Sequence, residues 1–221
     1  DVTKQLSTFA AGVSASTAAP RPIVTCVSAN AITAQEAMPT IIGSAVPSKN
    51  APATAMANMS AAATELVALV KDQLVAKGAQ RVAVVNLPDA SQTPGFAGLD
   101  APTKGLLSQL SAQFNTTLAA GLSGVAQARI IDARGLIGAV ATAPASYGLS
   151  NVTEGACDPA KISGITRGGV VDGSSLFCNG TAGAQFNGLK AGASASTWFF
   201  ADGVHPTTGG HKVIGDIVYG Q

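Results

Sequence analysis

Two residues near the end of the chain have the types and the spacing of an acid–base pair. Asp202 stands three residues before His205 in the string ADGVHPTTGGH, residues 201–211. A carboxylate that accepts a hydrogen bond from one imidazole nitrogen fixes the tautomer, leaves the other nitrogen free as a base and stabilises the imidazolium that forms. With this spacing one turn can carry both groups, and Pro206 and a helix N-cap at Thr207 hold that turn in place. An arbitrary D-x-x-H is more often a solvated surface turn, so the interpretation depends on the surrounding pattern.

Other polar residues are weaker candidates for chemistry. His211 lies one turn into the expected last helix, where we interpret it as a partly exposed helix residue. Asp132 ends an expected strand, and we interpret it as structural because Asp202 already supplies an acid. The string DGSSL, residues 172–176, follows no strand and is interpreted as loop. The string GASAS, residues 192–196, is not a nucleophile elbow, because no strand-turn-helix pattern surrounds it.

The three cysteines predict one disulfide and no metal site. Cys157 and Cys178 bracket a stretch rich in Gly and Ser. In an oxidising compartment this pair would close a loop of about 20 residues and stabilise the fold by roughly 3 kcal/mol. Two separate buried thiols are the alternative, and Cys26 is then free or paired with a residue outside the chain. No C-x-x-C spacing with a nearby histidine supplies metal ligands, so we expect neither a metal nor another cofactor.

Hydrophobic periodicity predicts the elements that must position the acid–base pair. Leu66, Val70 and Leu74 recur at four-residue spacing in a helix over about 54–77. The apolar, β-branched run at 81–89 predicts a strand buried on both faces. The remaining elements are a modest helix over 3–16, an irregular stretch over 17–52, a helix over about 102–122, a short strand over 128–133, a helix over 134–143, a long loop over 144–196, a short strand or extended segment over 196–202, and a last helix from Thr207.

The order strand, helix, strand, helix predicts a parallel α/β sheet with helices on both faces. A sheet of this kind usually has about four to six strands, and this sequence supplies two clear ones. We therefore expect residues 1–221 to be a single domain that forms the C-terminal part of an α/β domain, with the N-terminal strands missing from this chain.

The composition narrows the classes of partner and compartment. Charged residues make up 11% of the chain and the formal net charge is +1, so we expect no nucleic-acid partner and no anionic-membrane partner. No apolar run approaches the length of a membrane span, and no signal peptide is visible at the N-terminus. The low charge, the abundance of small residues and the loop cysteines favour a secreted or periplasmic protein.

The string ADGVHPTTGGH resembles the C-terminal block of the SGNH, or GDSL, hydrolases, a family of flavodoxin-like lipases and esterases. Upstream strings follow the order found in secreted bacterial members, and the resemblance covers about residues 54–219. These strings are ELVALVK, VAVVNLPDASQTP, FNTTLAAGL, IIDARGLIGAV and PASYGLSNVTEGAC. The resemblance implies a three-layer α/β fold and ester hydrolysis by a Ser-His-Asp triad. His205 would be its general base and Asp202 the orienting partner of His205, acting on an ester of apolar acyl character.

The resemblance also identifies motifs that the 221 residues lack. The family's nucleophilic serine lies in a G-D-S-L block, and further oxyanion donors lie in a Gly block and a G-x-N-D block; none of these motifs occurs here, and DGSSL resembles the first only superficially. We expect an N-terminal polypeptide of very roughly 100 residues or more to carry the serine and the missing strands. Asp1 is interpreted as the last residue of the G-x-N-D block.

Two other functions stay open from the sequence. The first is a non-catalytic secreted interaction or structural domain that keeps an ancestral turn, and the second is a carbohydrate-ester deacetylase on the same fold. The apolar run Trp198, Phe199 and Phe200 before the turn is interpreted as core, with one ring as a candidate to line an acyl pocket.

Overall fold

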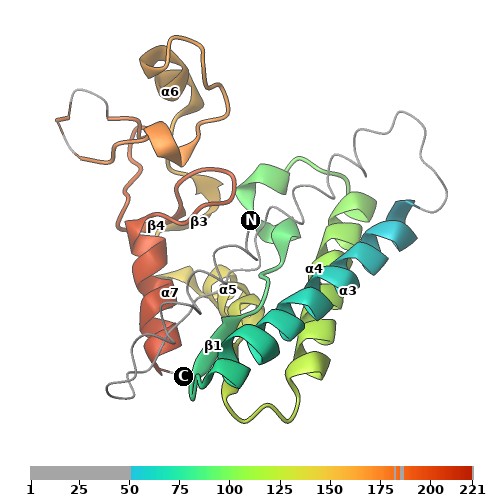
Figure 1. Ribbon diagram of the computed structural model, residues 1–221. Coiled ribbons are helices and arrows are strands. Elements are labelled where there is room, and N and C mark those ends of the chain that lie inside the picture. The colour runs from blue at the N-terminus through green and yellow to red at the C-terminus, as the bar shows by residue number, and fades with distance from the viewer. Residues whose placement is uncertain (1–50, 182, 185–186, 221) are drawn as a thin grey trace. The chain divides into compact units, whose positions relative to one another are not determined.

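The computed structural model describes residues 51–181, 183–184 and 187–220 (Figure 1). The predicted helix over 3–16, most of the irregular stretch over 17–52, Asp1 and Cys26 lie outside the described residues. The described chain divides into two compact units, residues 51–88 with 105–133 and residues 89–104 with 134–220. Each unit contains one pair of parallel strands. The prediction of a single domain stays a prediction.

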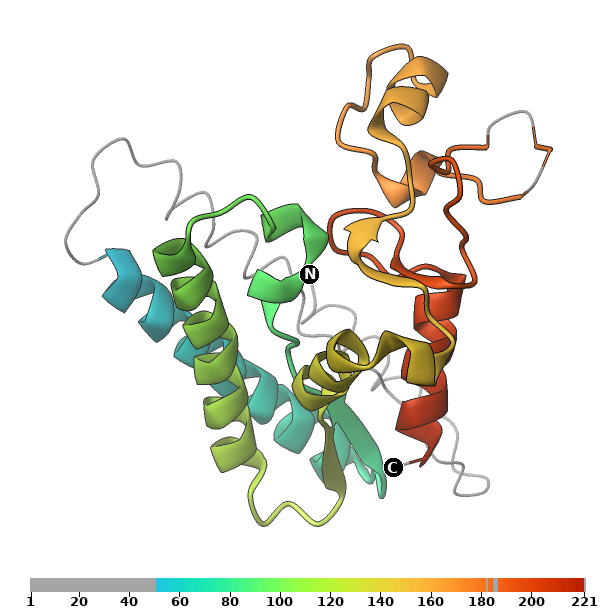
Figure 2. The same ribbon diagram turned by 180° about the vertical axis from the view of Figure 1, so that it is seen from behind.

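The first unit is built on two long helices that lie side by side, α3 (Ala51–Leu69) and α4 (Ala101–Leu122) (Figures 1 and 2). The α3 helix continues through a π-helical turn, η1 (Val70–Leu74), and a 3₁₀ turn, η2 (Val75–Lys77). It ends at Gly78, whose φ of 96° is left-handed, as is common after a helix C-terminus. The helix predicted over 54–77 is therefore confirmed.

The two helices approach closely because one of them carries a glycine at the contact. A Cβ on Gly121 of α4 would lie 2.5 Å from the Cγ2 of Val67 on α3. α4 confirms the helix predicted over about 102–122, and its apolar face, with Leu110, Phe114 and Leu118, is buried. Full burial of each such side chain stabilises a fold by roughly 1.5–3 kcal/mol.

The segment Pro52–Lys77 is long enough and apolar enough to be a candidate membrane span by length and composition. The prediction that no run approaches this length is therefore wrong. The core helix of a folded domain meets the same criteria, and here Leu66, Val67 and Val70 are buried. Val67 contacts α4, so this face of the helix packs within the first unit.

The described part of the first unit also contains two short strands. β1 (Val82–Val85) and β2 (Ala128–Ile131) pair in parallel, in register from Val82 opposite Ala128 to Val85 opposite Ile131. They confirm the strands predicted over 81–89 and 128–133, with shorter bounds. Beyond their ends the Nδ2 of Asn86 donates to the Oδ1 of Asp132 at 2.9 Å.

The second unit contains both histidines and the predicted acid–base pair. Its core joins α5 (Ala133–Thr142), β4 (Trp198–Phe200) and α7 (Thr208–Gly220), and the buried members of the cluster are Leu136, Val140, Leu149, Phe199, Phe200 and Val213. The rings of Phe199 and Phe200 meet edge to face, with their centroids 4.9 Å apart. These two phenylalanines are core residues, as predicted.

The prediction of an unbroken loop over 144–196 is wrong, because this segment contains a strand and a helix. β3 (Asn151–Gly155) pairs in parallel with β4, and α6 (Pro159–Ile165) follows it. α6 begins at an N-cap, since the Oδ1 of Asp158 accepts from the N–H of Ala160 at 2.9 Å, and Pro159 occupies the first helical position. β3 has five residues and α6 has seven, so neither is long enough to show the hydrophobic periodicity on which the prediction relied.

Candidate active site

Main-chain hydrogen bonds close the turn that carries Asp202 and His205. β4 ends at Phe200, and the N–H of Ala201 donates to the carbonyl of His205 at 2.7 Å. Farther from the tip, the N–H of Thr207 donates to the carbonyl of Phe199 at 2.9 Å. The acid and the imidazole therefore project from one tight loop whose two sides are both tied to β4.

Thr207 joins this turn to α7. Its Oγ1 accepts from the N–H of Gly210 at 3.0 Å, which is the N-cap geometry predicted from the sequence. The first turn of α7 lies directly against the chain before the site, since a Cβ on Gly209 would lie 2.2 Å from the carbonyl oxygen of Ser196. The consecutive glycines after Thr207 therefore allow the helix to start at this place.

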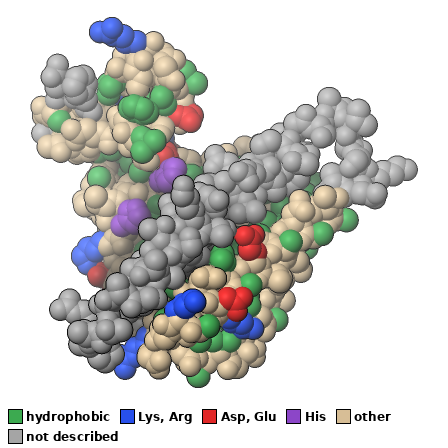
Figure 3. All heavy atoms as spheres, viewed as in Figure 1, with side chains coloured by type: hydrophobic (Ala, Val, Ile, Leu, Met, Phe, Trp, Pro, Cys, Tyr) green, Lys and Arg blue, Asp and Glu red, His purple; other side chains and the backbone are tan. Residues whose placement is uncertain are grey.

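The structure brings the two predicted site residues into direct contact. The Nδ1 of His205 lies 2.9 Å from both the Oδ1 and the Oδ2 of Asp202. The Asp202 side chain is only 8% exposed, whereas that of His205 is 65% exposed. The Asp202 carboxylate is therefore buried in the second unit, whereas the His205 imidazole bound to it is exposed to solvent. Figure 3 shows histidine side chains, in purple, at the surface of the face it draws.

Main-chain donors hold the Asp202 carboxylate in its charged form. Its Oδ1 accepts from the N–H groups of His205 at 2.8 Å and Val204 at 3.0 Å, and its Oδ2 accepts from the N–H of Ser175 at 2.8 Å. Burial alone would raise the pKa of Asp202, but these hydrogen bonds, together with one from the Ser175 side chain, outweigh it and lower the pKa to about 2. The carboxylate is therefore ionised at neutral pH and can only accept hydrogen bonds.

The charge of Asp202 determines the tautomer of its neighbour. Because the carboxylate is an acceptor, the Nδ1 of a neutral His205 carries the proton and donates it. Its Nε2 then has a free lone pair, and none of the described residues contributes a hydrogen-bond partner to it. An imidazole in this state is ready to accept a proton from a hydroxyl group.

The contact of Ser175 with Asp202 was not predicted from the sequence, although Ser175 lies in the DGSSL string. The string is loop, as predicted, and its end forms a 3₁₀ turn, η6 (Ser175–Phe177). The contact with Asp202 joins residues 27 apart in sequence, and no local pattern indicates such a partner. The predicted disulfide between Cys157 and Cys178 is confirmed, with a Cα–Cα distance of 5.9 Å.

Gly95 and Gly155, which the sequence did not identify as site residues, allow other segments to pack against the turn that carries Asp202. The N–H of Gly95, in the 3₁₀ turn η4 (Pro94–Phe96), donates to the carbonyl of Gly203 at 2.8 Å. A Cβ on Gly155, the last residue of β3, would lie 2.8 Å from the carbonyl oxygen of Asp202. Side chains at these positions would displace the turn that carries the acid.

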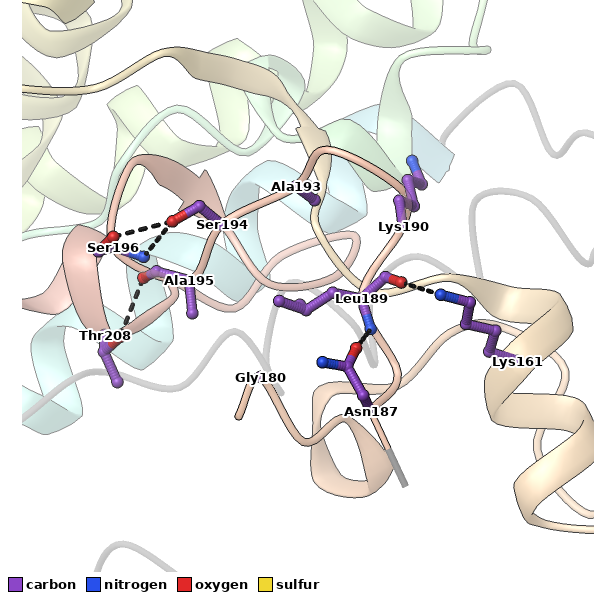
Figure 4. Close-up of a pocket in the computed structure, with 10 residues that line it drawn as sticks. All are labelled: Lys161, Gly180, Asn187, Leu189, Lys190, Ala193, Ser194, Ala195, Ser196 and Thr208. Carbon is purple, nitrogen blue, oxygen red and sulfur yellow. Dashed lines mark hydrogen bonds between the residues drawn. The ribbon is translucent and has the colours of Figure 1, made fainter. Parts of the chain in front are cut away.

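A hollow of about 340 Å³ borders the turn at Asp202 and Gly203, and Gly155 and Cys157 also line it. A larger hollow of about 650 Å³ is drawn in Figure 4, and neither Asp202 nor His205 lines it. Side chains of the larger hollow bind the loop itself: for example, the Nζ of Lys161 donates to the carbonyl of Leu189 at 2.6 Å. The smaller hollow therefore reaches Asp202, whereas His205 lines neither hollow.

The remaining candidates from the sequence lie in ordinary structural surroundings. His211 is exposed on α7, and its N–H donates to the carbonyl of Thr207 within the helix. Asp132 binds Asn86 in the first unit. Trp198 is partly buried, with the Nζ of Lys190 at 5.9 Å from the ring centroid.

Comparison with known proteins agrees with the motif at the turn. A family model described as GDSL-like Lipase/Acylhydrolase matches residues 5–218. No curated protein matches the chain. The family match covers nearly the whole sequence and confirms both the resemblance seen in the motifs and the predicted SGNH α/β fold class.

Proposed function

The chain belongs to the GDSL-like lipase/acylhydrolase family, and we propose that Asp202 and His205 are the acid and base of a serine-dependent carboxylic-ester hydrolase. Family membership supports hydrolysis of ester substrates. The observation that carries the residue assignment is the contact of the His205 Nδ1 with both oxygens of a buried, ionised Asp202, at 2.9 Å, while the rest of the imidazole is exposed.

The proposed reaction uses both imidazole nitrogens of His205. The Nε2 accepts the proton of a serine hydroxyl as the serine oxygen attacks the ester carbonyl carbon. The imidazolium is stabilised by Asp202 and returns that proton to the departing alcohol, which leaves an acyl-serine. Water, deprotonated by the same Nε2, then attacks the acyl carbon and releases the acid and the free serine. No metal or cofactor takes part in these steps.

The nucleophile is proposed to come from a polypeptide segment that carries a G-D-S-L block. No G-D-S-L string occurs in the 221 residues. Ser175 is a poor substitute, because its N–H binds Asp202 from a loop turn rather than from a strand-to-helix elbow. The segment acts either as a separate chain after cleavage or as a continuation of this one.

The surroundings of the pair support an ester with an apolar acyl group. Val204, next to His205, and Leu176, next to Ser175, are both exposed hydrophobic side chains. The disulfide between Cys157 and Cys178 supports an oxidising compartment, as for a secreted or periplasmic enzyme. Charged residues make up 11% of the chain, in keeping with an uncharged substrate.

The first test determines which polypeptides make up the native protein. Intact-mass measurement and N-terminal sequencing, under denaturing and non-reducing conditions, will reveal a segment with a G-D-S-L block if one accompanies these residues. The complete protein is then assayed with p-nitrophenyl butyrate and p-nitrophenyl octanoate. We expect hydrolysis of both esters.

Histidine variants assign the chemistry. We expect His205→Ala to lower kcat by about 10⁶-fold, as removal of the triad histidine does in serine hydrolases. His211→Ala is the matched control, because His211 is the other histidine of the chain and is exposed on α7; we expect it to retain full activity. Undiminished turnover by His205→Ala, or no turnover by the complete protein, would show instead a non-catalytic domain or a different site. Preference for acetylated sugars over both esters would identify a carbohydrate-ester deacetylase.

A further inference from the structure

We propose that the loop closed by the Cys157–Cys178 disulfide positions the catalytic acid, and that Ser175 is the positioning residue through which it acts. This inference rests on the proposed function and deepens it. Among the described residues, the Ser175 N–H is the one main-chain donor on the Asp202 carboxylate that comes from outside the catalytic turn, and it binds Oδ2 at 2.8 Å. The other two donors, Val204 and His205, both bind Oδ1.

The local sequence directs this N–H toward the acid. The Oδ1 of Asp172 accepts from the N–H of Ser174 at 3.1 Å, which forms a turn. Gly173, between them, has a φ of 73°, a conformation that favours glycine. It is also packed closely, since a Cβ there would lie 3.1 Å from the Cγ of Pro159. The chain therefore reverses just before Ser175 and presents its N–H to Asp202.

The disulfide connects this loop to the strand segment that leads into the catalytic turn. The N–H of Cys157 donates to the carbonyl of Ala201 at 2.7 Å, and Ala201 immediately precedes Asp202. Cys157 is bonded to Cys178, which lies three residues after Ser175. The Asp202 carboxylate is therefore connected to the loop in two ways. Ser175 binds it directly. Cys157 binds the neighbouring Ala201 and is covalently bonded to Cys178 of the loop.

The first half of the loop has anchors of its own. In α6, Ile162 is fully buried. Lys161 donates to the carbonyl of Leu189, as Figure 4 shows. This half would keep its place if the disulfide were opened.

The second half lacks comparable apolar anchors. Val171 is 71% exposed, Leu176 is 86% exposed and Phe177 is 46% exposed. Hydrophobic burial therefore contributes little to holding Ser175 in place. The N–H of Gly188 donates to the carbonyl of Asn179 at 3.0 Å, and the disulfide at Cys178 is the covalent constraint on this end of the loop. Its reduction is expected to weaken the contact of the Ser175 N–H with Asp202.

The test removes the N–H without disturbing the fold. Ser175→Pro deletes this donor, and the site accepts proline, because Ser174 has φ −47° and ψ 130° and Ser175 is the first residue of η6. Ser175→Ala is the matched control: it loses the hydroxyl, which also lowers the pKa of Asp202, but keeps the N–H, so the difference between the two variants isolates the N–H. Titration of ¹³C-labelled aspartate carboxyl groups by NMR follows Asp202 directly, and backbone spectra verify that both variants fold.

We expect the pKa of Asp202 to rise from about 2 toward its ordinary value of 3.8 in Ser175→Pro, and to rise less in Ser175→Ala, which loses only the smaller contribution of the hydroxyl. Reduction of the disulfide with dithiothreitol should raise the pKa of Asp202 in the wild type and leave it unchanged in Ser175→Pro, because the same contact is lost in both cases. An unchanged pKa in Ser175→Pro, or additive effects of the two changes, would overturn the proposal.

Turnover by the complete protein separates this proposal from the proposed function. With p-nitrophenyl butyrate we expect Ser175→Pro to lower kcat about tenfold and Ser175→Ala to lower it far less, because one charge-assisted hydrogen bond to the acid is lost. A raised Asp202 pKa in a protein that hydrolyses no ester would support the positioning role and refute the esterase. Hydrolysis that requires His205, together with an unchanged Asp202 pKa in Ser175→Pro, would support the esterase and refute the positioning role of Ser175.

Discussion

Replacing Asp202 with asparagine measures how much the buried charge contributes to stability. The pKa of this carboxyl is lowered from 3.8 to about 2 in the folded chain. At about 1.4 kcal/mol per pKa unit, the lowering corresponds to about 2 kcal/mol of folding stability. A lowered pKa means that the folded state binds the proton less readily than the unfolded state. The contribution is therefore fully present above about pH 4 and is lost as the pH falls toward 2.

Asp202→Asn keeps the shape of the side chain but is neutral at every pH. Urea unfolding at a series of pH values from 6 to 2 gives the free energy of unfolding of wild type and variant. The fluorescence of Trp198, the one tryptophan of the chain, reports on the unit that contains the site. We expect the wild type to exceed the variant most at pH 6. That difference should shrink by about 2 kcal/mol between pH 5 and pH 2.

The control for this experiment is Asp216→Asn. Asp216 is an exposed carboxylate on α7 that binds Lys212 one turn away, and such surface pairs contribute little. Its difference from the wild type should stay nearly constant with pH. If the difference between wild type and Asp202→Asn were also constant, the main-chain donors would not be stabilising the charge, and the assigned role of Asp202 would lose its physical basis.

Three further predictions concern the elements that support the site. Gly209→Ala should destabilise the second unit by several kcal/mol in urea unfolding, because its Cβ would overlap a main-chain carbonyl at 2.2 Å; Gly215→Ala on the same helix meets nothing within 4 Å and should stabilise it by about 0.5–1 kcal/mol. Thr207→Ala should cost about 1 kcal/mol through loss of the α7 N-cap, with Thr207→Ser close to wild type, and a larger loss in the serine variant would contradict this reasoning. Leu118→Ala should lower the free energy of unfolding by about 2–5 kcal/mol, because it opens a cavity at the buried face of α4. Thermal or urea unfolding followed by far-ultraviolet circular dichroism measures this loss. A loss below about 1 kcal/mol would show that the surrounding side chains move to fill the space.

Long helices and local turn chemistry were predictable because their signals lie within a few residues of each other. The four-residue spacing of Leu66, Val70 and Leu74 identified the buried face of the helix predicted over 54–77. The N-cap at Thr207 is a local hydrogen bond and was predicted at the correct residue. The pairing of Cys157 with Cys178 was one of two open interpretations, and the structure selects it.

Elements too short for periodicity were missed. β3 has five residues of mixed polarity, and it becomes a strand by pairing with β4, more than forty residues later in the chain. α6 has a sequence signal, since Asp158 and Pro159 form a standard helix start, but a seven-residue helix has too few turns to show an apolar face. Pairing and packing partners far along the chain determine such elements, and no local window contains them.

The candidate site divides in the same way. By itself, the sequence determined that Asp202 and His205 share one turn ahead of a capped helix, because a three-residue spacing leaves the two groups within reach of each other. Only the tertiary structure decided that the carboxylate would be buried and would gain a third main-chain donor, because Ser175 and the closely packed Gly95 and Gly155 come from distant segments. Spacing along a chain can bring an acid and a base together, but the folded surroundings determine the pKa of the acid and thereby the state of the base.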